Sequence, residues 1–204
     1  MSPASSQAAD DEVVFTGGQD GAARLDQAEP IKALPASPSF HAQLKVWLCD
    51  NEPAITLMED LLFIAARWDD LIDRDQVLLD SDIHHLMETA LSLPCNSFFV
   101  QHFASLYPLL HNAIRNWKVS LELERNPLYH PNQDARELAL INAFILRSSY
   151  IDVLGQCACI LAGNTWAEHV TRAARLRNSQ EGFALYRQNL AREQQVRAER
   201  DRRP

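Results

Sequence analysis

Three aspartates close a long apolar segment of the sequence at Asp69, Asp70 and Asp73, in the pattern D-D-x-x-D. In a helix Asp69 and Asp73 share a face, where two carboxylates can bind one hard cation such as Mg²⁺. Without a cation the like charges repel, and the negative end of the helix dipole disfavours each acid by about 0.3–1 kcal/mol. The pattern therefore indicates a metal site, unless Arg67 and Arg74 neutralise the acids at a solvated helix end.

A second set of oxygen ligands follows further along the chain, at Asn116, Ser120 and Glu124. Their spacing of i, i+4 and i+8 places all three on one face of a helix. If the short helix between the two sets reverses the chain, the two long helices run parallel. Counted from the two helix starts, Asp69 and Asn116 then differ in height by only roughly 5 Å. We expect the two polar faces to meet.

The order D-D-x-x-D followed by N-x-x-x-S-x-x-x-E resembles the two metal motifs of class I isoprenoid synthases. The resemblance implies an all-α enzyme in which carboxylates on facing helices hold Mg²⁺ against a substrate diphosphate. It implies that Asp69 and Asp73 are ligands of the first motif, and that Asn116, Ser120 and Glu124 are ligands of the second. The interval between the motifs is shorter here than in that family.

Two charged residues, Arg147 and Asp152, interrupt the most apolar part of the sequence, 138–161. Charge is seldom buried without a partner, and on one helix these two residues lie on different faces, so we expect partners on other helices that fix the helix register. In the functional alternative, Arg147 binds a phosphate and Asp152 serves as a further metal ligand or base.

Hydrophobic periodicity predicts the elements that position these residues: an all-α fold, a single bundle of about five to six helices. Asn51 and Asn132 are expected to begin helices, Gly163 to end one, and Pro108 to kink one. The expected helices cover about 39–49, 52–74, 81–92, 97–124, 132–161 and 165–190.

The ends of the chain are expected to differ from this bundle. Residues 1–38 are rich in Ser, Ala, Gly, Asp and Pro and lack sustained periodicity, which predicts a disordered arm. Residues 39–190 form the predicted helical domain, and 191–204 a charged, frayed tail. The four cysteines include no C-x-x-C pair and are expected to be buried, reduced thiols.

Composition argues against several classes of partner and cofactor. A net charge of −8 gives no basic field for nucleic acid or for an anionic membrane surface. The sequence shows no secretory signal and no run of about 18 uninterrupted apolar residues, so we expect a cytoplasmic protein that does not span a membrane. No glycine-rich phosphate loop is present, which disfavours ATP and nicotinamide chemistry.

A second resemblance covers more of the chain. The segments ARWDDLIDRD, LLHNAIRNWKVSLELE and LRSSYIDVLGQCACILAG resemble a group of small uncharacterised proteins of tailed bacteriophages. The resemblance implies a place in the bacterial host cytoplasm or in the virion, and it implies no reaction.

Two functions remain open from the sequence. The favoured one is a non-catalytic interaction or assembly module that binds another protein through the arm and through exposed aromatics of the last helix, Trp166, Phe183 and Tyr186. The alternative is a Mg²⁺-dependent, isoprenoid-synthase-like protein that binds or acts on a phosphate or diphosphate compound. The short chain and the motif spacing favour the first, and the oligomeric state stays open.

Overall fold

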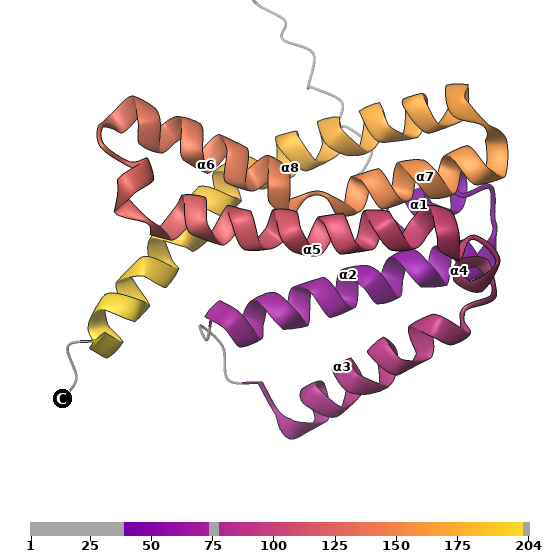
Figure 1. Cartoon of the computed structure of the whole chain (residues 1–204), viewed down its shortest axis with the longest axis horizontal. Coiled ribbons are helices and arrows are strands. Elements are labelled where there is room, and N and C mark those ends of the chain that lie inside the picture. Colours follow the sequence, from indigo (N-terminus) through magenta and orange to yellow (C-terminus); the bar gives the residue numbers. More distant parts are fainter. Residues whose placement is uncertain (1–38, 74–77, 202–204) are drawn as a thin grey trace, which may run out of the picture. The chain divides into compact units, whose positions relative to one another are not determined.

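Helices make up the described part of this computed structural model, residues 39–73 and 78–201, of which 179–181 and 196–201 are described as backbone only. No strand occurs among these residues, so the predicted all-α class is confirmed (Figure 1). The α-helices are α1 Phe40–Trp47, α2 Glu52–Asp73, α3 Asp80–Ser92, α4 Ser97–Gln101, α5 Phe103–Arg125, α6 Gln133–Arg147, α7 Tyr150–Ala162 and α8 Asn164–Asp201, with 3-10 turns η1 Leu93–Cys95 and η2 Pro127–Tyr129.

The eight α-helices of the described residues exceed the predicted five to six. The excess arises because two long predicted helices are each divided in two. All the described helices belong to one unit, Pro38–Pro204. The predicted arm, 1–38, lies outside the described residues.

The helix predicted over 132–161 is interrupted at Ser148 and Ser149, between α6 and α7. The Ser148 hydroxyl donates to the carbonyl of Ile145 at 2.8 Å, and the Ser149 hydroxyl donates to the carbonyl of Leu146 at 2.7 Å. Serine side chains that bond to nearby backbone groups compete with the helical ladder. The interruption turns the chain just after Arg147.

The helix predicted over 97–124 is interrupted at His102, between α4 and α5. Pro108, where a kink was predicted, lies inside α5. The cap of α4 is Asn96, one residue before the predicted start, and its side chain accepts the amide of Phe99 at 3.0 Å. The chain thus breaks at His102, before the proline.

The other predicted helix ends are close to those observed. The Asn51 side chain accepts the Ala54 amide at 3.0 Å, and Asn132 begins α6. Gly163 ends α7 with a φ of 84°, which glycine adopts without strain. α8 continues past the predicted end at 190 to Asp201, so the backbone is helical over 191–201.

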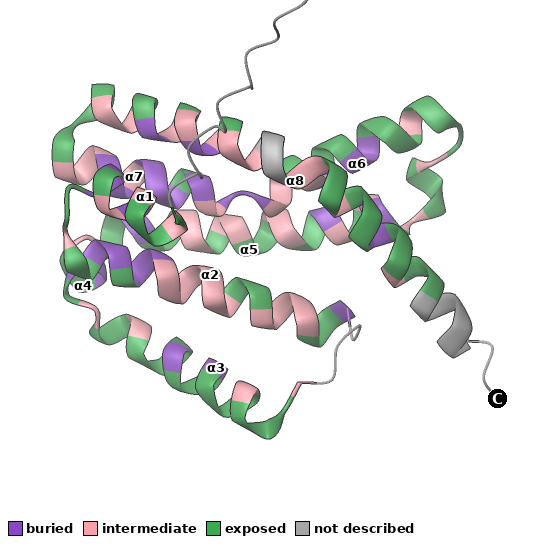
Figure 2. Cartoon of the chain, turned by 180° about the vertical axis from the view of Figure 1, so that it is seen from behind, coloured by how far each residue is buried: buried purple, intermediate pink, exposed green. Residues whose placement is uncertain are grey.

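The core gathers around α7 and the first half of α2 (Figure 2). α7 contributes six buried residues, whereas Leu138, Ile141 and Ile145 of α6 are exposed, so the expectation that the whole apolar segment 138–161 is the most buried holds only for its second half. Gly155 of α7 allows close packing, because a Cβ there would lie 2.5 Å from the Thr171 hydroxyl of α8. The second half of α2 is less buried, and Leu71 and Ile72 are exposed.

Figure 1 shows the arrangement that positions the polar residues. α3 reverses the chain after α2, so that α2 and α5 run in the same direction, as expected. α7 and α8 form an antiparallel pair on the other side of α5. The C-terminal ends of α2 and α5 therefore lie at the same end of the fold.

The cysteines are free, but only Cys157 is fully buried. Burial raises the pKa of its thiol to about 12. Cys49 and Cys95 are exposed, so the prediction of buried thiols is wrong for these two. Both lie in short connections between helices, which run over the surface.

One apolar stretch, Gln133–Ala162, is long and apolar enough to cross a membrane by length and composition alone. It comprises α6 and α7, and half of its apolar window is buried inside the fold. Ile151 and Leu154 of α7 belong to the hydrophobic core. Packing against the other helices thus accounts for the buried half of this stretch.

Candidate functional site

Arg147, the last residue of α6, lies at the centre of a buried ionic cluster. Its guanidinium donates to Glu124 of α5 through two bonds, Nε to Oε1 at 2.6 Å and a terminal nitrogen to Oε2 at 2.8 Å. The Glu124 side chain is only 1% exposed and the Arg147 side chain 17%. Such a two-pronged pair is directional and holds the end of α6 against the end of α5.

The first acidic motif meets the same arginine from α2. Asp69 accepts a bond from Arg147 at 2.7 Å, and a carboxylate oxygen of Asp73 lies 3.9 Å from the guanidinium. Asp73 is also paired with Arg125, the last residue of α5. The predicted meeting of the two polar faces therefore occurs, with arginines between the acids.

A fourth helix joins the cluster through Tyr186 of α8. Its hydroxyl donates to Glu124 Oε1 at 2.7 Å. Burial and the negative charge of Glu124 raise the pKa of Tyr186, so the phenol stays protonated and remains a donor. The network of Asp69, Asp73, Glu124, Arg125, Arg147 and Tyr186, the Arg147 cluster, thus links α2, α5, α6 and α8.

Burial and pairing have opposite effects on the titration of the cluster. Burial would lower the pKa of Arg147, but bonding to Glu124 and the charges of Glu124 and Asp69 raise it above the ordinary value. For Asp69, burial raises the pKa despite the neighbouring Arg147. Arg147 is therefore permanently charged, while Asp69 ionises at a cost that its ion pair does not fully offset.

The other predicted metal ligands have different partners. The Asn116 amide donates to the Ser149 hydroxyl at 2.8 Å, and the Ser120 hydroxyl donates to the carbonyl of Trp117 at 2.6 Å. Asp70 pairs with Arg67 at 3.0 Å. This pair agrees with the alternative interpretation, in which Arg67 neutralises the acidic motif.

Within the described residues, no group of three or more His, Cys, Asp or Glu side chains is arranged to hold a metal ion. The carboxylates of Asp69 and Glu124 already accept the guanidinium of Arg147. For a Mg²⁺ ion to bind both, Arg147 would have to move away. The metal site stays a prediction.

Asp152 does not belong to the Arg147 cluster. Its carboxylate is 46% exposed and pairs with Arg175 of α8 at 2.8 Å. Arg175 also donates to the Ser148 hydroxyl at 2.8 Å. Arg147 and Asp152 thus find partners on other helices, as expected of residues that fix helix register.

Two members of the cluster were not identified from the sequence. Arg125 was not considered, although a helix C-terminus is where a cation is favoured. Tyr186 was assigned to an exposed patch with Trp166 and Phe183, and all three are in fact partly buried. The indole of Trp166 donates to the carbonyl of Trp47 at 2.9 Å, and Phe183 packs edge-on against a phenylalanine of α6. The predicted aromatic patch on α8 is therefore wrong.

An apolar groove of about 650 Å³ lies beside the cluster, between α2 and α5. Although both helices line it, their backbones do not pack closely along its length. Trp68 of α2 and Trp117 of α5 stack across it with ring centroids 4.4 Å apart, next to Arg147. Further lining residues include Leu61, Ile64, Ala65, Ala90, Phe99, Phe103, Tyr107, Leu110, Ala113, Ile114, Tyr150 and Val153.

Apolar side chains continue from the groove onto its rims. On α5, Phe103 and Tyr107 are each 49% exposed, and their rings stack at 4.9 Å. On α3, Met87 is 54% exposed and shares a helix face with Ile83 and Ala90. A continuous exposed apolar surface on a folded domain often marks a binding site, whereas single exposed apolar side chains do not.

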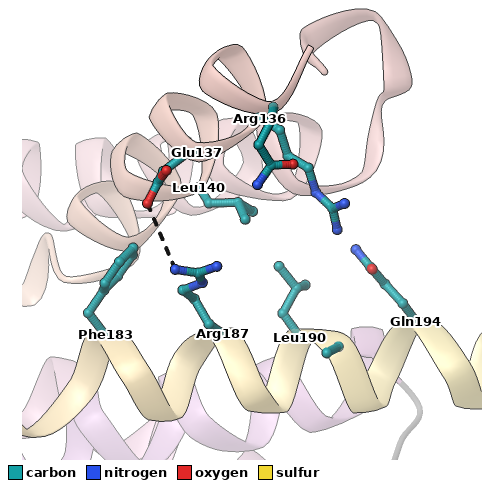
Figure 3. Close-up of a pocket in the computed structure, with 9 residues that line it drawn as sticks. Arg136, Glu137, Leu140, Phe183, Arg187, Leu190 and Gln194 are labelled. Atoms are coloured by element: carbon teal, nitrogen blue, oxygen red, sulfur yellow. Dashed lines mark ion pairs between the residues drawn. The ribbon is translucent and has the colours of Figure 1, made fainter. Parts of the chain in front are cut away.

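A second pocket, between α6 and α8, is much smaller, at about 190 Å³ (Figure 3). Arg187 of α8 faces Glu137 of α6 across it, with 3.8 Å between their charged atoms. Both side chains are about half exposed, so the pair contributes little. Ligand pockets usually occupy about 300–1,000 Å³, a range that includes the groove but not this pocket.

The chain matches no known protein-family model, no curated protein and no solved structure. The resemblances to phage proteins and to isoprenoid synthases therefore stay predictions. Any function has to be argued from the cluster and the groove themselves.

Proposed function

We propose that the protein is a non-catalytic helical module that binds another protein, and that the partner docks in the apolar groove between α2 and α5. The observation that carries the proposal is the groove itself, about 650 Å³ in volume and bordered by half-exposed aromatic and aliphatic side chains. Burying such surface on a partner is favourable, at about 25 cal/mol per Å² of apolar area.

The Arg147 cluster has a structural role in this proposal. Its acids are paired with Arg147 and Arg125, and the Glu124 side chain is almost fully buried. The cluster joins the C-terminal end of α2 to α5 and α6, next to the Trp68–Trp117 stack. It thereby holds the two walls of the groove at a defined separation.

A selection experiment tests the groove without a known partner. Peptides of about 16 residues would be selected from a random displayed library on the full chain, and their affinities measured by fluorescence anisotropy. The variant Ala113→Trp places an indole in the groove, and it should weaken the selected peptides at least tenfold.

The matched control is Ala184→Trp, which adds the same side chain at an exposed alanine of α8 outside the groove lining. It should leave the affinities unchanged. Selected peptides that bind both variants as tightly as the unmodified protein would refute a partner site in the groove. Circular dichroism and thermal melting show whether each variant is folded.

The phage resemblance gives this proposal a setting, the bacterial host cytoplasm during infection or the virion. In either place a small module without a reaction of its own would act through the protein it holds.

A second candidate function rests on the convergence of Asp69, Asp73 and Glu124 at the end of an apolar groove. In this alternative Mg²⁺ replaces Arg147 among the carboxylates and binds a diphosphate whose apolar part lies in the groove. A Mg²⁺ titration followed by thermal melting tests it. A bound ion should raise the melting temperature of the unmodified protein and leave Asp69→Asn/Asp73→Asn unmoved.

A further inference from the structure

Charge is distributed very unequally between the two walls of the groove. α2 and α3 together carry nine Asp and Glu side chains and a single Arg or Lys, Arg67. The opposite wall, α5, carries Arg115, Lys118 and Arg125 against two glutamates. The imbalance places most of the net negative charge of the described helices on α2 and α3.

Acidic side chains lie next to the apolar face on that wall. In helical projection the groove-lining face of α2, which includes Leu61 and Ile64, is flanked by Asp60 on one side and Asp69 on the other. Burial, and then the charge of Glu59, raise the pKa of Asp60, while the nearby His85 lowers it. Asp60 thus places a carboxylate beside the groove-lining face, where a basic side chain of a partner can pair with it.

The length of the groove indicates the size of its occupant. From Phe103 to Trp117 the lining side chains follow α5 for about 21 Å, at 1.5 Å per residue. An α-helix of about 14 residues spans the same length. The walls are themselves parallel helices, and an amphipathic helix can lay its apolar face along a groove of this kind.

We propose that the partner segment is a basic amphipathic helix of about 14 residues. This inference rests on the proposed function and specifies the chemistry of its partner. The apolar face of the segment packs between α2 and α5, and its Lys and Arg side chains lie along the acidic α2–α3 edge. This is the helix-in-groove mode of recognition, with apolar contacts for affinity and charge for orientation.

Three fluorescein-labelled model peptides of about 18 residues test the inference. All carry leucines in the same amphipathic helical pattern, and their polar positions are all Lys, all Gln or all Glu. Anisotropy titrations with the full chain should give the tightest binding for the Leu/Lys peptide, and raising the salt from about 0.05 to 0.3 M should weaken it several-fold. The Leu/Glu peptide should bind at least tenfold more weakly.

Two sets of variants separate apolar docking from charge attraction. Ala113→Trp, or the truncation Phe103→Ala/Tyr107→Ala if the first variant does not fold, should weaken the Leu/Lys peptide at least tenfold without any change in charge. Asp60→Asn/Asp80→Asn should weaken it roughly threefold to tenfold at low salt. Asp134→Asn/Glu168→Asn removes two exposed acids outside the groove lining and should change the affinity less than twofold.

Each outcome bears on a different claim. If the Leu/Gln and Leu/Glu peptides bind as tightly as Leu/Lys and all three are lost in the groove variants, the basic character of the partner is wrong while the groove still binds helices. If Leu/Lys binds equally to the groove variants, it adheres by charge alone and the helix-in-groove inference is overturned. If none of the three peptides binds and the random library yields no groove-dependent peptide, the proposed function fails as well.

Discussion

Replacing Glu124 by glutamine should destabilise the folded protein by about 3 kcal/mol, because the substitution leaves Arg147 buried with less than its full counter-charge. Breaking one member of a buried pair usually costs about 3–5 kcal/mol. The lower end of this range applies here, because Asp69 and Asp73 remain within 2.7 and 3.9 Å of the guanidinium. Glutamine keeps an acceptor for the Tyr186 hydroxyl, so that bond survives.

Removing the other partner of the pair, by Arg147→Met, should destabilise the folded protein more, by about 4–5 kcal/mol. It leaves the almost fully buried Glu124 without either guanidinium bond, and removes the ion pair of Asp69 with Arg147. In the double variant the buried charge at 124 is gone as well as the cation. The double variant should therefore cost about 2–3 kcal/mol less than the two single costs combined.

Urea unfolding followed by circular dichroism measures all four free energies of unfolding, and constant m-values show that only stability has changed. The exposed pair Asp152 and Arg175 provides the control, and the cycle of Asp152→Asn and Arg175→Met should give a coupling below about 1 kcal/mol. If the costs of Glu124→Gln and Arg147→Met add to within about 0.5 kcal/mol, the two residues do not act as a buried pair and the structural role of the cluster is wrong.

Three further predictions concern single positions. Because burial raises the pKa of Asp69, the folded protein takes up a proton on this carboxyl more readily than the unfolded chain, and the free energy of unfolding increases as the pH falls through the folded pKa. Asp69→Asn should remove this pH dependence, and at pH 7 it should cost less stability than Glu124→Gln. Urea titrations at several pH values measure both effects. Gly155→Ala should destabilise by about 1–3 kcal/mol through the clash with the Thr171 hydroxyl, and the added change Thr171→Ala should recover most of that loss in thermal melts; full stability of the single variant would contradict the close packing. Iodoacetamide at pH 8 should label the exposed Cys49 quickly and Cys157 only on unfolding, and equal rates by mass spectrometry would show that α7 is not buried as described.

The class of fold and most helix ends follow from local chemistry and could be predicted. Apolar periodicity needs only the helical repeat, and Asn51, Asn132 and Gly163 act on their immediate backbone neighbours. The meeting of the two polar faces could also be predicted, because parallel helices of similar length place Asp69 and Glu124 at the same end. These features depend on spacing along one helix, or on the direction of two.

The breaks within helices were harder to predict, because they depend on competition between nearly equal local structures. Serine is tolerated in many helices, and here the hydroxyls of both Ser148 and Ser149 bond back to the preceding turn. At His102 the chain leaves one helix and begins another without a strong sequence signal.

What neutralises the acids, and where apolar surface remains open, was decided only by tertiary structure. Motif spacing places carboxylates on a face, but it does not say that Arg147 from a helix far along the chain lies between them, or that Tyr186 bonds to Glu124. Likewise, the groove is lined by side chains of α2, α3, α5 and α7, which come together only in the folded chain. Contacts across helices depend on how whole faces pack, and that information is distributed over the entire chain rather than carried by any one motif.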